Sequence, residues 1–389
     1  MKVLSIVVLV SIFGVSDAKR VFHPIVTTEA AYVVEVNKQT ESDSKSVART
    51  TEQVLQAGAI HIAAQQCPDG GFGWPHNNCD VTYHNITPPI IDGVRQAYKL
   101  QENPGYLGVM VAAGDFDLTH EYGNGDARFG AFTAYQMWNL SQDSGDSIYY
   151  DFTEAEFFAA LEAGTYGDSD WDTDGWITAI ETSRTGAWIN LRPWEFSSLV
   201  LIAQRHCRDV QSGDFEQALW RGLGTLDNSD PDTVYNDIIG VAGGLLGLAR
   251  INRTSFPAIN APLHDGVNKI GTLQGLADYL VSQQNSDGSF FWHSNLAAPT
   301  EGDKGTQTTA YAVLALTKAQ ERLPNSDYLA AIDLGKTYLT SMQTADGGFA
   351  SFPGDTEHNT EIEGEALTAI GTVGVYDRIY QSGLECFVN

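Results

Sequence analysis

Residues 66–74 read "QCPDGGFGW", and a closely related phrase occurs twice more in the chain. Residues 284–292 read "QNSDGSFFW", and residues 343–349 read "QTADGGF". Each copy follows an apolar helical pattern, and its Asp-Gly pair is typical of a turn that ends a helix. A polar loop and a second helix rich in small residues come after each copy. The phrase therefore predicts a helical pair that is repeated along the chain.

The pairs can be counted along the sequence. Second helices are expected to begin near residues 82, 125, 190, 233, 305 and 358, and first helices are expected at 46–66, 103–114, 153–164, 208–226, 271–284 and 328–343. The second helices are apolar almost all round, which indicates burial in an inner ring, whereas the first helices carry one apolar stripe. We therefore predict an all-α fold, an (α/α)6 toroid of six inner and six outer helices in one domain over residues 46–389.

The Gln-x-x-Asp-Gly-Gly-Phe phrases resemble the Gln-Trp repeats of the terpenoid cyclase and protein prenyltransferase superfamily. The closing stretch, "QTTAYAVLAL…MQTADGGFASFPGDTEHNTEIEGEALTAI", is similar to secreted, squalene-cyclase-like members. The resemblance implies a toroid, but the superfamily includes cyclases, prenyltransferases and noncatalytic carriers, and a similar toroid occurs in one family of pectate lyases. The chain lacks the Asp-x-Asp-Asp acid of the cyclases on an inner helix. It also lacks an Asp-x-Cys that would bind zinc with Cys207. The resemblance therefore favours the fold and not isoprenoid chemistry.

The first eighteen residues, "MKVLSIVVLVSIFGVSDA", have a basic Lys2, an apolar run and small residues at the end. This pattern is typical of a secretory signal peptide, and no later stretch has the length of a membrane span. We therefore expect a secreted, extracellular protein in which residues 19–45 form an extended lead-in.

An oxidising compartment favours disulfides between the four cysteines. Cys67 and Cys79 flank one loop and are the expected pair, while the pairing of Cys207 and Cys386 stays open. Of the three sequons, at Asn85, Asn139 and Asn252, the last two are favoured for glycosylation because Asn85 is expected to lie inside the fold, and whether they carry glycans stays open.

The charge of the chain limits its partners. Lys and Arg total 22 against 49 Asp and Glu, which gives a formal net charge of −27. This balance excludes nucleic acid, whose phosphates need basic neutralisation, and it disfavours anionic membranes. It suits solubility and the binding of divalent cations.

Residues 168–181, "DSDWDTDGWITAIE", have the spacing of a calcium loop. Asp170, Asp172 and Asp174 stand at positions 1, 3 and 5, the Trp176 carbonyl at position 7 and Glu181 at position 12. Gly175 allows the sharp turn that such loops need. We therefore predict Ca²⁺ binding in an insertion at residues 165–186. Because the loop is single, a structural role is favoured over a regulatory one.

The inner helices of a toroid run parallel, so their N-termini gather at one mouth, where chemistry is expected. The candidate site residues near these starts are His84, Arg128, Arg192, Glu195, Tyr235, Asp237 and Glu363. A polysaccharide lyase would use His84 or Tyr235 as base, with Arg128 or Arg192 binding a uronate carboxylate. A glycoside hydrolase would use two carboxylates from Glu195, Asp237 and Glu363.

The sequence therefore predicts a calcium-binding toroid that binds or processes an extracellular polysaccharide. Two alternatives stay open. One is a noncatalytic structural or carrier protein. The other is a terpenoid cyclase-like enzyme acting on a small apolar ligand.

Overall fold

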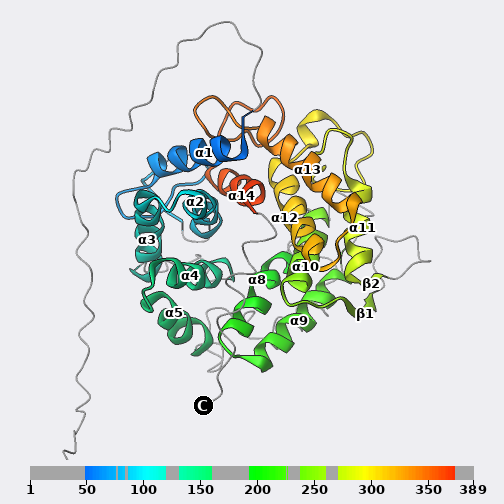
Figure 1. Ribbon diagram of the computed structural model, residues 1–389, viewed down its shortest axis with the longest axis horizontal. Coiled ribbons are helices and arrows are strands. Elements are labelled where there is room, and N and C mark those ends of the chain that lie inside the picture. Colours follow the sequence, from blue (N-terminus) through cyan, green and yellow to red (C-terminus); the bar gives the residue numbers. More distant parts are fainter. Residues whose placement is uncertain are drawn as a thin grey trace, which may run out of the picture. The chain divides into compact units, whose positions relative to one another are not determined.

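The computed structural model describes residues 49–75, 78–83, 86–119, 131–159, 192–224, 226, 237–259 and 270–372. The described part is mostly helical (Figure 1). The predicted signal peptide at 1–18, the lead-in at 19–45 and the calcium insertion at 165–186 lie outside the described residues. None of the described helices is long and apolar enough to cross a membrane.

Within the described residues, six helices form a closed inner ring (Figure 1). Each inner helix contacts the next one along the chain, and the last contacts the first. Small residues allow this close packing; Gly364 of the last helix, for example, lies against the backbone of Ile90 in the first. The inner helices are α2 (Thr87–Gln101), α4 (Ala131–Ser144), α8 (Arg192–Arg205), α10 (Asp237–Arg250), α12 (Thr306–Arg322) and α14 (Thr360–Gly371).

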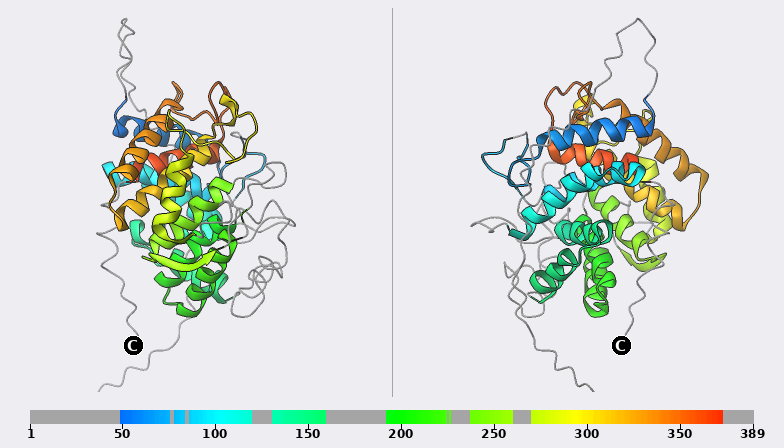
Figure 2. Two further views of the ribbon diagram at one scale, coloured as in Figure 1. Left: turned by 90° about the vertical axis from the view of Figure 1, so that its right-hand side faces the viewer. Right: turned by 60° about the vertical axis from the view of Figure 1, so that its left-hand side comes forward.

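The outer layer packs on this ring and alternates with it along the chain. Its members are α1 (Thr51–Gln65), α3 (Pro104–Thr119), α5 (Ile148–Phe152) with the π-helix η1 (Thr153–Phe158), α9 (Asp209–Leu223), α11 (Leu273–Gln283) and α13 (Ser326–Ser341). Figure 2 shows α1, α14 and α2 side by side, although α1 and α14 lie near opposite ends of the sequence. The predicted (α/α)6 toroid is confirmed, and the predicted start of each inner helix precedes the observed one, by a single residue for α12 and by more for the others.

One element was not predicted. Strands β1 (Ser255–Ile259) and β2 (Ile270–Thr272) pair antiparallel in the connection between α10 and α11. The alternation of Ser, Phe, Pro, Ala and Ile in β1 is too short to signal a strand within a helical repeat. A 3-10 turn, η3 (Glu301–Asp303), precedes α12.

The repeated glutamine explains why the phrase recurs. In each copy its side-chain amide donates one hydrogen bond to the turn that follows and one to a carbonyl of the next outer helix. The three sets of acceptors are Gly70 and Val109 (α3) for Gln66, Gly288 and Ala331 (α13) for Gln284, and Gly347 and Val54 (α1) for Gln343. Each copy therefore docks one outer helix onto its neighbour, and the third copy closes the ring.

The Asp-Gly turn permits this docking. Gly70, Gly288 and Gly347 have φ values of +93°, +93° and +100°, in the region that favours glycine. A Cβ at any of them would lie 2.2–2.5 Å from a carbonyl oxygen of the next outer helix. The phenylalanine two residues later is fully buried in every copy, at Phe72, Phe290 and Phe349. The motif thus packs the end of one outer helix against the next outer helix, and its buried phenylalanine holds the turn in the core.

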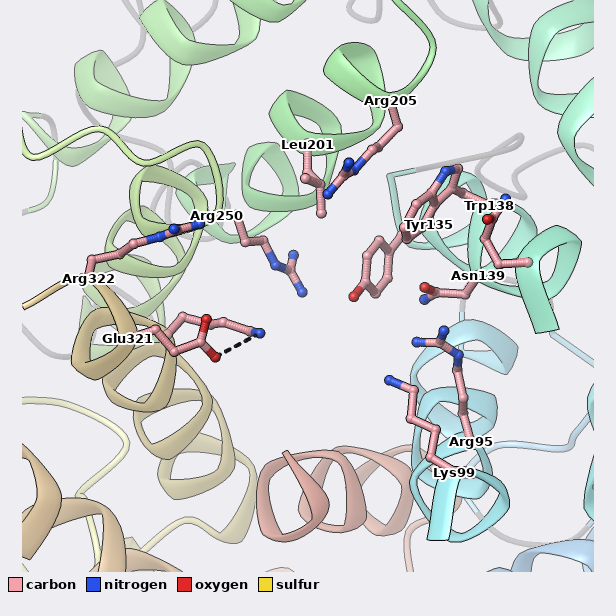
Figure 3. Close-up of a pocket in the computed structure, with 12 residues that line it drawn as sticks. Arg95, Lys99, Tyr135, Trp138, Asn139, Leu201, Arg205, Arg250, Glu321 and Arg322 are labelled. Carbon is pink, nitrogen blue, oxygen red and sulfur yellow. Dashed lines mark hydrogen bonds and ion pairs between the residues drawn. The ribbon is translucent and has the colours of Figure 1, made fainter. Parts of the chain in front are cut away.

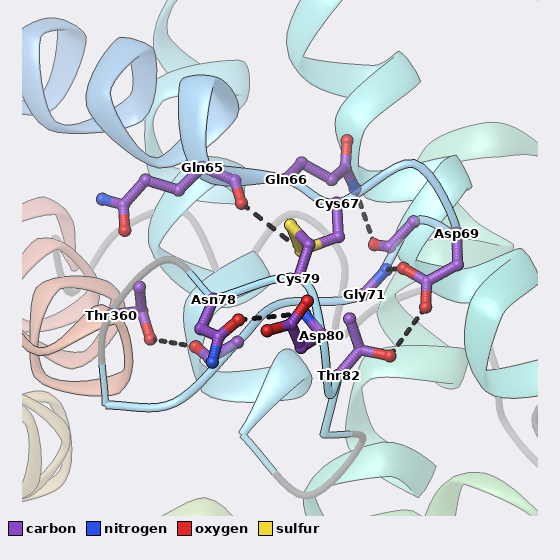
Figure 4. The surroundings of a disulfide bond; sticks show 12 residues. Gln65, Gln66, Cys67, Asp69, Gly71, Asn78, Cys79, Asp80, Thr82 and Thr360 are labelled. Carbon is purple, nitrogen blue, oxygen red and sulfur yellow. Dashed lines mark hydrogen bonds between the residues drawn. A yellow bond between two sulfur atoms is a disulfide. The ribbon is translucent and has the colours of Figure 1, made fainter.

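The predicted disulfide between Cys67 and Cys79 is confirmed, with a Cα–Cα distance of 5.5 Å (Figure 4). It closes the loop of the first copy, in which Thr82 donates a hydrogen bond of 2.6 Å to Asp69. Cys207 is also disulfide-bonded.

Candidate functional site

A pocket lies among the C-terminal halves of the inner helices, where six basic side chains meet (Figure 3). We call these residues the basic pocket: Arg95 and Lys99 of α2, Arg205 of α8, Arg250 of α10, and Lys318 and Arg322 of α12. Figure 3 shows Arg95, Lys99, Arg205 and Arg250 pointing into the space that the inner helices enclose. Such a gathering is notable in a chain whose net charge is −27.

Local helix chemistry explains why basic residues occupy these positions. Lys99, Arg205, Arg250 and Arg322 all stand in the last turn of their helices. The partial negative charge at a helix C-terminus stabilises cations there. Arg95 and Lys99, like Lys318 and Arg322, are four residues apart and therefore share a helix face. Because the inner helices run in the same direction, their last turns converge.

Neighbouring side chains orient the guanidinium groups. Arg95 forms a two-point ion pair with Asp143, in which Nη2 lies 3.1 Å from Oδ1. Arg250 stacks 4.6 Å from the centre of the Tyr135 ring and donates to Ser198 Oγ at 3.3 Å.

Arg205 lies 5.2 Å from the centre of the Trp138 ring. Its buried Nε has no hydrogen-bond partner among the described residues. At least one donor of the pocket is therefore unsatisfied within the described structure.

The pocket holds more positive charge than its acids neutralise. Burial and, to a smaller extent, the nearby Arg95 lower the pKa of Lys99 to about 8, although Asp143 and Asp92 oppose this shift. Burial likewise lowers the pKa of Lys318 to about 8, although its Nζ lies 3.2 Å from Glu321. An anion bound in the pocket would raise the pKa of both lysines, because a nearby opposite charge favours their protonated forms.

Asp92 of α2 is a carboxyl group that lines an adjoining pocket, which shares Arg95, Lys99, Arg250 and Lys318 with the basic pocket. Burial raises its pKa, and the cations Arg95, Lys99 and Arg250 oppose that rise. Asn139 Nδ2 donates to Asp92 Oδ1 at 3.3 Å. A carboxyl group with a raised pKa in a pocket is suited to donate or accept a proton.

This contact corrects one sequence prediction. Asn139 was favoured for glycosylation, but it is 2% exposed and faces the pocket, so the folded chain has no room for a glycan there. Asn252, the other favoured sequon, is exposed.

Three carboxyl groups, those of Glu361, Glu363 and Glu365, gather in the first turns of α14. Glu365 of α14 is buried and accepts hydrogen bonds from Tyr311 and from Gln307 of α12, the latter at 3.2 Å. Burial raises the pKa of Glu365 well above its usual range, and Glu361 one turn earlier raises it further. The carboxyl groups near the N-terminus of α14 thus contrast with the basic side chains at the C-terminal ends of the inner helices.

The predicted site residues divide into three groups. His84, Arg128, Tyr235 and the calcium ligands Asp170, Asp172, Asp174, Trp176 and Glu181 lie outside the described residues. Arg192 and Glu195 stand in the first turn of α8 and Asp237 begins α10, but their side chains are not described. Glu363 is 1% exposed and lies 3.3 Å from both His61 Nε2 and His358 Nδ1. It does not line the basic pocket.

The basic pocket was missed because each basic residue, taken alone, is an ordinary helix C-terminal charge. The available signal was the recurrence of Lys or Arg at the last turn of successive inner helices. Only the closed ring shows that these turns face one another.

Comparison with known proteins gives matches of structure alone, since no family model and no curated protein sequence matches this chain. An unsaturated glucuronyl hydrolase specific for heparin matches with 12% identity and a TM-score of 0.51 over 85% of this chain and 98% of that one. An unsaturated glucuronyl hydrolase from Streptococcus agalactiae matches with 13% identity and a TM-score of 0.52 over 84% and 92%. A possible GH105 member from Klebsiella pneumoniae matches with 11% identity and a TM-score of 0.51 over 87% and 96%.

These similarities support the α/α toroid. They do not single out the terpenoid cyclase superfamily that the repeats resemble, because glycoside hydrolases have the same ring.

Proposed function

We propose that the protein binds an acidic saccharide of extracellular glycans in the basic pocket. The observation that carries this proposal is the convergence of six basic side chains in a strongly acidic chain. Arginine binds carboxylate and sulfate groups through paired hydrogen bonds, which gives both charge and geometry. An anionic ligand would also satisfy the buried Nε of Arg205.

We propose further that the protein processes this saccharide as a glycoside hydrolase or a polysaccharide lyase. The structural matches to glucuronyl hydrolases support a saccharide as the class of ligand. Asp92 supplies the proton-transfer group, because it lines the pocket that adjoins the basic pocket and burial raises its pKa. A hydrolase would use it as an acid toward the leaving oxygen, and a lyase would use a base to remove the proton beside the uronate carboxylate.

The described pocket does not favour an isoprenoid ligand. Cyclisation of an isoprenoid proceeds through carbocations, and a lining of arginine and lysine would repel them. Binding of a saccharide without formation of a product would support the alternative of a noncatalytic carrier protein.

Binding is tested by titrating uronic acid oligosaccharides into the purified protein, with neutral oligosaccharides of equal length for comparison. Arg205→Gln and Arg250→Gln should each weaken binding of the acidic oligosaccharide about tenfold or more, since a charge-assisted hydrogen bond contributes roughly 1.5–3 kcal/mol. Arg253→Gln is the matched control, because Arg253 stands just after α10 and pairs with Glu216 outside the pocket. The basic pocket would be ruled out as the site if Arg205→Gln and Arg250→Gln bound the acidic oligosaccharide as tightly as Arg253→Gln does. It would also be ruled out if the parent protein bound neutral and acidic oligosaccharides equally well.

Processing is tested on the same oligosaccharides. New reducing ends without absorbance indicate hydrolysis, whereas the absorbance of an unsaturated product indicates a lyase. Asp92→Asn should abolish product while leaving the affinity within a few-fold. Product formation at the parent rate in Asp92→Asn would move the catalytic group elsewhere.

We also propose that the chain is secreted and binds Ca²⁺ through residues 170–181. The disulfide between Cys67 and Cys79 supports an oxidising compartment. The complete spacing of oxygen ligands in the loop supports calcium.

A further inference from the structure

Three side chains from the two ends of the ring meet where it closes. His61 comes from α1, His358 from the loop before α14, and Glu363 from the first turns of α14. His61 Nε2, His358 Nδ1 and one Glu363 oxygen all lie within 4.8 Å of one another. Each imidazole nitrogen is 3.3 Å from the same oxygen, Oε1.

Surrounding groups fix the orientation of these donors. His61 Nδ1 lies 3.2 Å from the carbonyl oxygen of Asp346, and His358 Nε2 lies 3.4 Å from the Asp346 carboxylate. Gln65 donates to Glu363 Oε2 at 2.9 Å. With a proton on each outward nitrogen, both inward nitrogens present a lone pair, as metal-binding histidines held by an outer carbonyl or carboxylate do.

Two of the inward atoms, on His61 and Glu363, are buried. His61 Nε2 and Glu363 Oε1 lie 3.3 Å apart without a well-aligned hydrogen bond, and the nearby Glu363 raises the pKa of His61. Donors bound at 2.0–2.2 Å to one tetrahedral ion lie about 3.4 Å apart, close to the separation seen here. Gly348 leaves room for the cluster, because a Cβ at this position would lie 2.3 Å from His358 Nδ1 and 2.7 Å from Glu363 Oε1.

The other two copies of the repeat serve as internal comparisons. His61 is the fourth residue after the carbonyl that the turn glycine touches, and Phe116 and Tyr338 hold this position elsewhere. Glu363 is the fourth residue of its inner helix, where the other copies have Ile90 and Thr309. His358 stands two residues before its inner helix, where the second copy has Lys304. The three ligand-type side chains thus occur together in the copy that joins the last repeat to α1.

We infer that His61, His358 and Glu363 form a binding site for a divalent transition-metal ion of the zinc type. Two imidazole nitrogens and one carboxylate oxygen suit zinc or cobalt and not calcium, which takes oxygen ligands. Three protein donors leave one position of a tetrahedral ion to water. The ion joins α1 to α14 and thereby closes the toroid. This site is separate from the predicted calcium loop and from the basic pocket.

The test uses the chain without a polyhistidine tag, saturated with Ca²⁺ so that the predicted calcium loop is occupied. Zinc is titrated by calorimetry, and cobalt is added to record the visible absorption of a four-coordinate ion. The parent protein should bind one zinc ion per chain. Glu363→Gln keeps the shape of the side chain, and His61→Phe introduces the residue type of the first copy. Both should weaken zinc by more than the roughly 10–100-fold that loss of an outer-shell partner costs.

Glu361→Gln is the matched control, since Glu361 is on the same helix but does not belong to the cluster. It should bind zinc as the parent does, and its cobalt spectrum should be unchanged. A melting curve of each variant in chelator shows whether it is folded. Parent protein that binds no zinc, or a folded Glu363→Gln that binds zinc as tightly as the parent, would overturn the site and leave the cluster as a histidine–carboxylate ion pair.

Discussion

Two lysines decide how the basic pocket responds to pH. The pKa values of Lys99 and Lys318 are lowered to about 8, because burial penalises their charged forms. Below about pH 8 both are protonated and the pocket has its full positive charge. Above that value they lose protons, so the affinity for an acidic saccharide should fall by up to about tenfold per pH unit for each lysine. Dissociation constants measured from pH 6.5 to 9.5 at constant ionic strength check this.

Lys99→Gln separates this effect from general alkaline changes. The variant has one titrating lysine fewer, so its affinity should start lower and decline less steeply above pH 8. An affinity that stays flat to pH 9.5 in the parent would contradict the assignment of the two lysines to the binding site.

Glu363 is a residue whose place on a helix could be predicted from the sequence but whose partners could not. The sequence placed it correctly near the start of an inner helix and predicted a catalytic carboxylate. Its partner His61 comes from α1, however, 302 positions earlier in the numbering. A contact across that separation depends on ring closure, which no local pattern contains.

At the scale of the elements, the repeated glutamine connects neighbouring outer helices by a hydrogen bond from its side-chain amide. Gln284→Ala would leave the carbonyls of Gly288 and Ala331 without their side-chain donor. We expect a loss of about 1–3 kcal/mol in the free energy of unfolding, the cost of leaving partly buried acceptors unsatisfied. Denaturant titration measures this loss.

The neighbouring Gln283 provides the control. It is of the same residue type and lies one position earlier, but its side chain bonds only to Ser282 among the described contacts. Gln283→Ala should change the stability by less than about 0.5 kcal/mol. Equal losses in the two variants would mean that the motif glutamine has no special role in docking.

The calcium loop is a further element with its own test. Any ion that binds only the folded state raises its stability, so removal of Ca²⁺ should lower the melting temperature. Calcium returned after chelation should restore it, and Asp170→Ala should abolish the response. Zinc bound at His61, His358 and Glu363 would not replace calcium, because that cluster shares no residue with the loop. If the melting temperature were the same with and without calcium, the prediction that residues 170–181 bind Ca²⁺ would be wrong.

For the whole molecule, the sequence predicted the architecture well and the pocket poorly. The architecture follows from helical periodicity and a repeated turn, both of which are local signals. The pocket depends on which ends of the helices face an open space. We expected chemistry near the helix N-termini, where Glu361 and Glu365 do gather, whereas the basic pocket lies at the C-terminal ends. Arg205 and Arg250 form a candidate binding site only because the folded ring brings the ends of their helices together around one pocket.

The closed ring predicts how the molecule unfolds. In an open helical array the terminal repeats have one neighbour and lose structure first. Here α1 and α14 pack on each other and on α2, so neither lies at an open end. We therefore expect the amides of α1 and α14 to exchange hydrogen at the same free energy as those of α12.

Native-state exchange in low denaturant, followed by mass spectrometry, measures this directly. Gln343→Ala is the informative variant, because Gln343 joins the third copy to Val54 of α1. It should lower the protection of α1 below that of α12, whereas the parent should show a single cooperative unit. If α1 of the parent already exchanged at a much lower free energy than α12, the contacts between first and last repeats would be too weak to close the ring, and the molecule would behave as an open array.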